Sequence, residues 1–408
     1  MTPSASDILN KAKKDFPIIK ADRHFLHNHA EIGFDIPKTY EYVSNALKNM
    51  GYTPIPCGKS GLYVLAGNIN KTSNLTNTRT FLLRADMDAV RINNNAIHAC
   101  GHDMHTAMLL GAARILKEYE NDINGTVKLM FQPAEETLSG CLNMINAGIL
   151  DNPSVDAALM LHVITGIPLK PGTAIVCDGG VSAPAADYFT IDIKGKGCHG
   201  AMPNTGIDPI TAASHIVIAL QELHARELSI ADKAALTIGT FNAGSANNVI
   251  PDTAILSGTF RAFDEDVRNY IKERLCHITN HIAKAFRTEA TVTFTNSCPT
   301  LKNDTDLSAC TKSYINELYL AINKSQSPSS TESTAKTSTP KMSGSEDFSY
   351  ISHKVPSIMV ALSAGHPDDG HNYPLHHPKV SFDENVLPTG SAIYAYTAIR
   401  WLQEHCSK

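Results

Sequence analysis

The sequence has no apolar run that approaches the roughly 20 residues needed to span a bilayer. Its first segment is polar and carries lysines, without the apolar stretch of a signal peptide. Cysteine is sparse: nine residues, an odd number, are scattered over 408 positions, which suits reduced thiols better than a disulfide framework. These absences predict a cytoplasmic protein that does not contact a membrane.

The chain also lacks a basic stripe interleaved with aromatic residues, and its formal net charge is -5. We therefore expect no nucleic acid among its partners. The chain is long: its 408 residues exceed the roughly 250 to 300 at which a single hydrophobic core stops growing. Two domains are expected.

The first part of the chain has the pattern of an α/β domain. Nearly apolar runs at 80–85, 126–131 and 157–161 are typical of strands buried on both faces. Apolar residues at helical spacing alternate with these runs. They predict helices at 5–29 (interrupted by Pro17), 38–50, 103–119 and 140–147.

From residue 185 the strands alternate between polar and apolar residues, which indicates a sheet with one face in water. The order strand, helix, strand, strand, helix, strand predicts a two-layer α+β domain with mostly antiparallel neighbours. We expect it at 185–296, inserted into a larger domain made of 1–184 and 297–408. After the insertion we expect a mobile Ser/Thr-rich loop at 322–340, a strand at 357–362 and a last helix at 387–404.

The segment His98–His105 (HACGHDMH) concentrates three histidines, one cysteine and one aspartate. Buried polar side chains need partners, and one divalent metal ion can satisfy several of them. Imidazole and thiolate suit zinc, whereas carboxylates admit manganese. Cys100 and His102 share a side only in an extended or looped segment, so a helix should begin just after them. Asp103 either caps that helix or orients a ligand.

Polar side chains follow three successive strand-like runs. Asp86 and Asp88 follow the first, Glu135 and Glu136 the second, and His162 ends the third. Sites in open α/β sheets form at the carboxyl ends of strands, so the repetition favours a site over a core histidine. The two aspartates are interpreted as ligands or as groups that hold ligands.

The candidate ligands are Cys100, His102, Glu136, His162 and one histidine of the loop His366–His377. Five ligands exceed what one tetrahedral ion with an open position needs, which favours two ions roughly 3.5 to 4 Å apart with a shared ligand. Glu135, beside a ligand, fits a general base that takes a proton from water.

Seven motifs in order resemble the M20 metallopeptidase family. Within it they are most similar to the amidohydrolase branch of hippurate hydrolases, N-acyl-amino-acid amidohydrolases and indole-acetyl-amino-acid hydrolases. The motifs span Arg84–Ala89, His98–Met108, Phe131–Glu136, Cys198–Pro203, Asn248–Asp252, Ser343–Phe348 and Leu375–Pro378.

The resemblance implies a zinc-peptidase-like catalytic domain, with a mixed sheet flanked by helices, and an inserted α+β dimerisation or lid domain. It implies two divalent metal ions per subunit, manganese or zinc, with cobalt or nickel possible, and a homodimer or higher oligomer. By motif position, Cys100 bridges the ions, His102, Glu136, His162 and His376 complete the ligands, and Glu135 is the base. His377 is the rival of His376, and Asp86 and Asp88 support the ligands.

The resemblance also assigns roles in the inserted domain. His199 resembles the histidine that reaches across the dimer to stabilise the oxyanion. Asn248 and Arg261 stand where the family places groups that bind the amino-acid carboxylate, a task that suits a guanidinium fork. A salt bridge on a strand is the alternative for Arg261.

Three departures from the family pattern remove no ligand. Ala30 replaces a proline, and the link between Asp88 and His98 is short, with Ile97 where methionine is common. That link would reshape the acyl side of the pocket. The third departure is the Ser/Thr-rich insertion before Met342.

The predicted function is hydrolysis of the amide bond of N-acyl amino acids, such as hippurate, to a carboxylic acid and a free amino acid. A dipeptidase or aminoacylase using the same site is the alternative among enzymes. An inactive relative that binds acyl amino acids as a sensor is the alternative outside them, and the intact Glu135 and ligand set argue against it.

Overall fold

The computed structural model describes residues 2–67, 78–324, 336–338, 342 and 344–406. The chain forms two compact units. The first comprises the described parts of Met1–Gly180, Lys302–Pro340 and Tyr350–Lys408, and the second those of Val181–Leu301 and Lys341–Ser349. The domain limits 185–296 stay a prediction.

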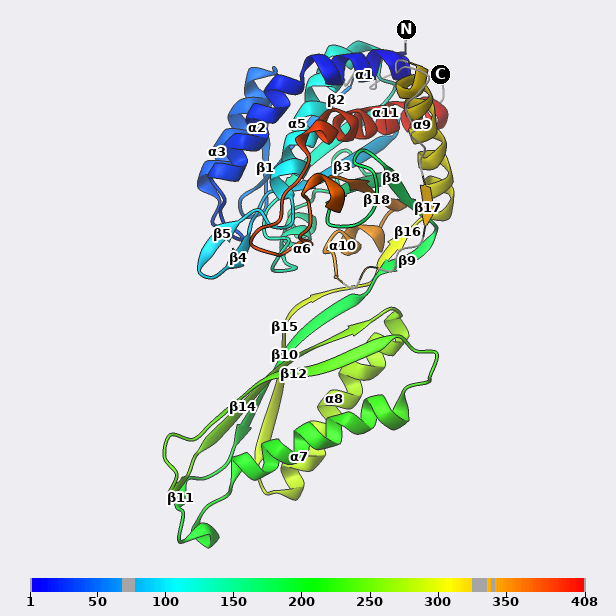
Figure 1. Cartoon of the computed structure of the whole chain (residues 1–408). Helices are drawn as coiled ribbons and strands as arrows, with labels where there is room; N and C mark the ends of the chain where they lie inside the picture. Colours follow the sequence, from blue (N-terminus) through cyan, green and yellow to red (C-terminus); the bar gives the residue numbers. More distant parts are fainter. Residues whose placement is uncertain (1, 68–77, 325–335, 339–341, 343, 407–408) are drawn as a thin grey trace. The chain divides into compact units, whose positions relative to one another are not determined.

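The first unit is built on a mixed eight-stranded sheet (Figure 1). Its four central strands are parallel to one another, whereas β2 and β8 run antiparallel to their inner neighbours. In spatial order the strands are β1 (Ile55–Cys57), β2 (Gly61–Ala66), β6 (Thr126–Gln132), β3 (Thr80–Asp86), β7 (Ala157–Ile164), β18 (Ser357–Ser363), β8 (Ala174–Cys177) and β17 (Lys336–Ser338).

Helices cover both faces of this sheet, and Figure 1 shows α5 and α11 on one side and α6 on the other. Every residue of β3, β6 and β18 is buried, as their apolar runs predict. The helices of the unit are α1 (Ala5–Lys14), α2 (Phe16–Asn28), α3 (Pro37–Asn49), α5 (His102–Glu118), α6 (Gly140–Asn146), α9 (Thr305–Lys324) and α11 (Leu387–His405). The short helix α10 (Ser349–Ser352) also belongs to it except for its first residue, Ser349, which is assigned to the second unit.

Two sequence predictions for this unit need correction. The segment 5–29 forms two helices, because Pro17 stands in the first turn of α2, where its missing N–H costs nothing. The proposed loop 322–340 is wrong at its described ends, since α9 runs to Lys324 and residues 336–338 pair with β8 as β17. Its remaining residues lie outside the described part of the chain.

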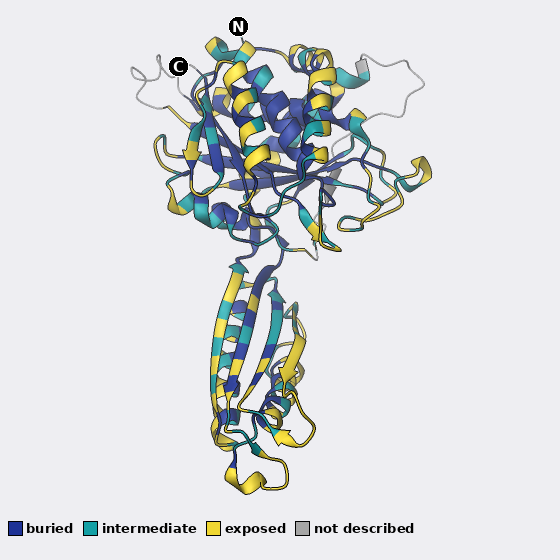
Figure 2. Ribbon diagram, turned by 90° about the vertical axis from the view of Figure 1, so that its left-hand side faces the viewer, coloured by how far each residue is buried: buried dark blue, intermediate teal, exposed yellow. Residues whose placement is uncertain are grey.

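The second unit has the predicted βαββαβ order. The antiparallel sheet β12-β14-β10-β15 packs against α7 and α8, and Figure 2 shows its strands alternating between buried and exposed residues. The elements are β10 (Ala185–Lys194), α7 (Pro209–Glu222, continued by a π turn at Leu223–Glu227), β12 (Ala234–Ala243), β14 (Thr253–Ala262), α8 (Glu265–Ala285) and β15 (Glu289–Cys298).

The remaining strands are short. They are β4 (Val90–Ile92), β5 (Asn95–Ile97), β9 (Gly180–Ala183), β11 (Cys198–His199), β13 (Val249–Ile250) and β16 (Leu301–Asn303). The nine cysteines all lie in the described part of the chain and form no disulfide bond. Among the helices that the structure describes, none combines the length and apolarity of a membrane span.

Candidate metal centre

The parallel strands of the first unit bring the polar residues of the sequence motifs to one edge of the sheet. Asp86 is the last residue of β3, Glu135 and Glu136 follow the end of β6, and His162 lies near the end of β7. The carboxyl ends of parallel strands meet at one edge, and this is where the side chains gather.

The loop before α5 presents Cys100 and His102 to this edge. Gly101 between them has φ +87°, and a Cβ there would lie 2.4 Å from Val163 Cγ2, so only glycine fits. The helix begins at His102, one residue earlier than predicted.

Asp103 is therefore not the N-cap, which is Gly101. It lies in the first turn, and its buried carboxylate Oδ2 is 2.8 Å from His27 Nδ1 and 2.9 Å from Arg23 Nε. Burial acts to raise the pKa of Asp103, but the hydrogen bond with His27, followed by the effects of His98 and Arg23, outweighs burial and lowers the pKa. The carboxylate thus links α2 to α5.

Two groups of potential ligands share Cys100. Cys100, His102 and His162 form the first and Cys100, Glu136 and His376 the second, with the ligand atoms of each group within 4.8 Å of one another. Cys100 Sγ lies 3.6 Å from His162 Nε2 and 3.2 Å from His376 Nε2. This is the arrangement expected of two ions with one bridging thiolate.

The orientation of the imidazoles fits a metal. His102 Nδ1 donates to the Asp88 carbonyl at 2.8 Å and His162 Nδ1 to the Val163 carbonyl at 2.7 Å, so in the neutral form of each ring it is Nε2 that has the lone pair for a metal ion. His102 Nε2 and Glu136 Oε1, 3.7 Å apart, are buried without a hydrogen-bond partner among the described residues. A bound cation would satisfy both atoms, which would otherwise destabilise the fold.

The pKa shifts at the site also fit a metal. Burial raises the pKa of the Cys100 thiol and raises that of Glu136 to about 7. Burial opposes the charge on His102, but the Asp86 carboxylate and its other neighbours outweigh this and raise its pKa. Metal binding would displace protons from these groups, because a coordinating thiol is deprotonated.

Asp88 and Asp86 hold the surroundings of the ligands. The Asp88 carboxylate accepts the backbone N–H groups of Glu135 at 3.0 Å and Glu136 at 3.3 Å, which fixes the turn that presents both. Asp86 Oδ2 is 2.7 Å from a guanidinium nitrogen of Arg84. Sequence reasoning gave Arg84 no role, although a charged residue in an otherwise apolar strand was the available signal.

His376, not His377, faces the cluster. Its backbone N–H donates to the Ala99 carbonyl at 2.8 Å. Its backbone angle φ of +67° is rare for a residue other than glycine. The His377 ring stacks on Tyr373 at 4.2 Å, and its Nδ1 accepts the N–H of Lys379.

The residues predicted to bind the rest of the substrate lie in the second unit. His199 is exposed on β11, and the carbonyl of Asn248 accepts the N–H of Gly200 at 2.8 Å. The Arg261 guanidinium bonds the hydroxyls of Thr259 and Tyr188 at 2.9 and 3.0 Å. The alternative salt bridge is wrong, since no carboxylate in the described ranges pairs with Arg261.

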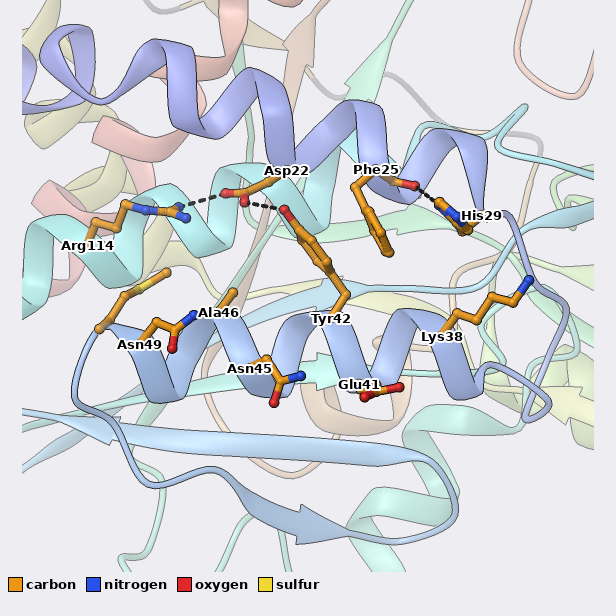
Figure 3. Close-up of a pocket in the computed structure, with 11 residues that line it drawn as sticks. Asp22, Phe25, His29, Lys38, Glu41, Tyr42, Asn45, Ala46, Asn49 and Arg114 are labelled. Carbon is orange, nitrogen blue, oxygen red and sulfur yellow. Dashed lines mark hydrogen bonds and ion pairs between the residues drawn. The ribbon is translucent and has the colours of Figure 1, made fainter.

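A separate pocket of about 610 Å³ lies between α2 and α3 (Figure 3). Among its lining residues, Asp22 is 2.8 Å from both Arg114 and the Tyr42 hydroxyl. None of the metal-ligating groups found in the described chain falls in this pocket, so the chemistry is expected at the Cys100 cluster.

Comparisons with known proteins show the family to which the chain belongs. The sequence profile of peptidase family M20/M25/M40 matches residues 82–400. The chain is 33% identical to N-acetyl-L-cysteine deacetylase of Bacillus subtilis (98% of this chain, 92% of the relative) and 32% identical to IAA-amino acid hydrolase ILR1-like 4 of Arabidopsis thaliana (98% and 90%). The crystal structure of the Bacillus subtilis YXEP protein, a dinuclear metal-binding peptidase from the M20 family, is similar with a TM-score of 0.73 and 26% identity, covering 96% of this chain and 99% of that one. The chain therefore belongs to the M20 family and is one of its amidohydrolases.

Proposed function

We propose that the protein uses two divalent metal ions to hydrolyse the amide bond of N-acyl amino acids, hippurate-like substrates among them. The carboxylic acid and the free amino acid are the products. The observation that carries this proposal is the pair of ligand groups that share Cys100, with Glu135 next to one of the ligands. The names of the two curated relatives support it, since each specifies a derivatised amino acid.

The ligands in this proposal are Cys100, His102, Glu136, His162 and His376. When bound, the two ions would act as Lewis acids toward the substrate carbonyl and lower the pKa of a water molecule. Manganese and zinc both suit this donor set, and cobalt or nickel are further candidates.

Glu135 is the proposed general base. Its Oε2 lies 3.9 Å from His102 Nε2, beside the ligands, and its backbone is fixed by Asp88. It takes the proton from the attacking water and delivers it to the leaving amine. Its neighbour Glu136 points toward Cys100 and His376, so one carboxylate can act as the base while the other binds metal.

Residues of the second unit complete the proposed mechanism. Asn248 and Arg261 bind the carboxylate of the amino-acid part, and His199 of the partner subunit stabilises the oxyanion of the tetrahedral intermediate. The protein would accordingly work as a homodimer or a higher oligomer. Its nine cysteines, which form no disulfide bond, suit a reducing compartment such as the cytoplasm.

Replacement of Glu135 by Gln tests the base. We expect turnover to fall about 10²- to 10⁴-fold, with two metal ions per chain retained, because only the proton acceptor is removed. Amino-acid release from hippurate, acetyl-amino acids and dipeptides would be measured after loading with manganese, zinc or cobalt. Metal content would be measured by plasma mass spectrometry, with the exposed Glu41→Gln as the matched control.

The outcomes separate the alternatives. A nearly active Glu135→Gln variant would exclude Glu135 as the base. Faster release from dipeptides than from acyl amino acids would favour the dipeptidase. Tight binding of acyl amino acids without turnover, with every metal, would identify a sensor.

A further inference from the structure

The strands β3 and β7 stop pairing before either one ends. Their ladder runs from Phe81 with Ala157 to Arg84 with Met160, and β7 continues to Ile164. Past that point a side chain bridges the strands: the Tyr394 hydroxyl donates to the Arg84 carbonyl at 2.8 Å and accepts the N–H of Leu161 at 3.1 Å. His162, one of the proposed ligands, lies on the part of β7 beyond this point.

His105, from the first turns of α5, makes the next bridge. Its Nε2 accepts the N–H of Val163 at 2.9 Å, so the proton of the neutral ring must be on Nδ1. That proton is donated to Asp86 Oδ1 at 2.6 Å. With both nitrogens engaged, His105 has no lone pair for a metal, although it forms a close group with Asp86 and His102.

The residue that His105 holds is the residue that orients a ligand. The carbonyl of Val163 accepts Nδ1–H of His162 at 2.7 Å, and the rings of His105 and His162 are in contact, with centroids 4.6 Å apart. The backbone of Val163 is thus bound through its N–H by one histidine and through its carbonyl by the other.

We propose that His105 is a positioning residue of the metal centre, because it joins Asp86 to the Val163 peptide and so fixes the tautomer and direction of His162. Groups that orient ligands in this way typically contribute 10- to 100-fold to metal affinity. The inference rests on the proposed ligand set, but not on any substrate.

Three substitutions separate the two bonds of His105. His105→Leu removes both, His105→Asn keeps a donor near the Nδ1 position for Asp86, and His105→Gln keeps an acceptor near the Nε2 position for Val163. Thr106→Val is the matched control, because Thr106 is equally buried and its hydroxyl bonds the Asp86 backbone carbonyl at 2.6 Å.

Zinc affinity would be measured on the metal-free full chain by competition with a chelator. We expect about 10- to 100-fold weaker binding of one zinc ion for the Leu and Asn variants, and binding within about threefold of the wild type for Gln and for Thr106→Val. Long-range ¹H–¹⁵N correlation spectra of the zinc form should show His105 as the neutral Nδ1–H tautomer.

The results test the role of His105 and the proposed metal centre separately. Equal losses for Gln and Asn, a thermal destabilisation without any loss of zinc affinity, or an Nε2–H tautomer of His105 would overturn the inference. Failure of the wild type to bind two zinc ions would instead overturn the proposed metal centre.

Discussion

Single residues join the N-terminal helices to the surroundings of the metal centre, and Glu384 is the clearest case. Its carboxylate lies 3.0 Å from Lys20 Nζ, 3.2 Å from an Arg23 guanidinium nitrogen and 2.6 Å from His24 Nε2. Arg23 in turn reaches the buried Asp103 beside His102. The three partner side chains all come from α2, so Glu384 holds this helix against the short turn Glu384–Val386 that precedes α11.

The pKa of Glu384 predicts how this contact depends on pH. Burial raises its pKa, but Lys20, Arg23 and His24 together outweigh burial and lower it below the usual value. A carboxyl whose pKa is lower in the folded state stabilises the protein above its unfolded pKa and loses that effect as the pH falls through the folded value.

Glu384→Gln should therefore lower the free energy of unfolding of the metal-free protein by about 1 kcal/mol at neutral pH, a modest amount because the contact is partly exposed. The difference from the wild type should shrink as the pH falls below about 4.5. Urea unfolding over this pH range measures it, with Glu41→Gln as the control. A difference that stays constant down to acid pH would contradict the charge-based explanation.

At the scale of secondary-structure elements, Lys128 fixes the loop that follows α6 to the central strand β6. Its side chain is fully buried, and Nζ donates to the carbonyls of Ile149, Asp151 and Pro153 at 2.7 to 2.9 Å. These three backbone acceptors explain why a lysine stands in the middle of an apolar strand.

Lys128→Met should destabilise the fold by about 1 to 3 kcal/mol, because it leaves buried carbonyls without a donor. Chemical unfolding measures the change, and the metal content of the folded variant should equal that of the wild type. Lys59→Met is a matched control, since Lys59 also lies over an aromatic ring, at 5.3 Å compared with 5.2 Å for Lys128, but is exposed. Similar losses for the two variants would show that the carbonyl contacts contribute little.

At the scale of the whole molecule, the proposed mechanism needs two chains. His199→Ala and Glu135→Gln should each be inactive alone, whereas a mixture should regain up to about a quarter of the wild-type activity. In an equal mixture half of the dimers are hybrids, and each hybrid has one complete site.

Activity would be followed after mixing under conditions that exchange subunits, with exchange checked by native mass spectrometry of differently tagged chains. Wild type mixed with Glu135→Gln is the control for any effect of the exchange procedure on activity, because exchange leaves the number of complete sites in this mixture unchanged. Hybrids without activity would place His199 outside the partner's site.

The fold class could be predicted because it depends on local patterns. Apolar runs at β3, β6 and β7 and alternation in β10 report burial on two faces or on one, and the βαββαβ order follows from the sequence of these periods. The end of α1 was missed because Pro17 was taken as an interruption within one helix, when it starts a second one.

The sequence by itself determined which kinds of group could form a metal site, because cysteine, histidine and carboxylate have the required donor atoms wherever they stand. Only the tertiary structure decided which of them meet. His376 and His377 are neighbours in sequence, yet only the first reaches Cys100, 276 residues earlier in the chain, since a left-handed backbone at His376 turns the two rings apart. The same holds for Asp103, Arg84 and His105, which bond His27 of α2, Gln132 of β6 and Val163 of β7. A contact between distant segments leaves no periodic pattern in the sequence.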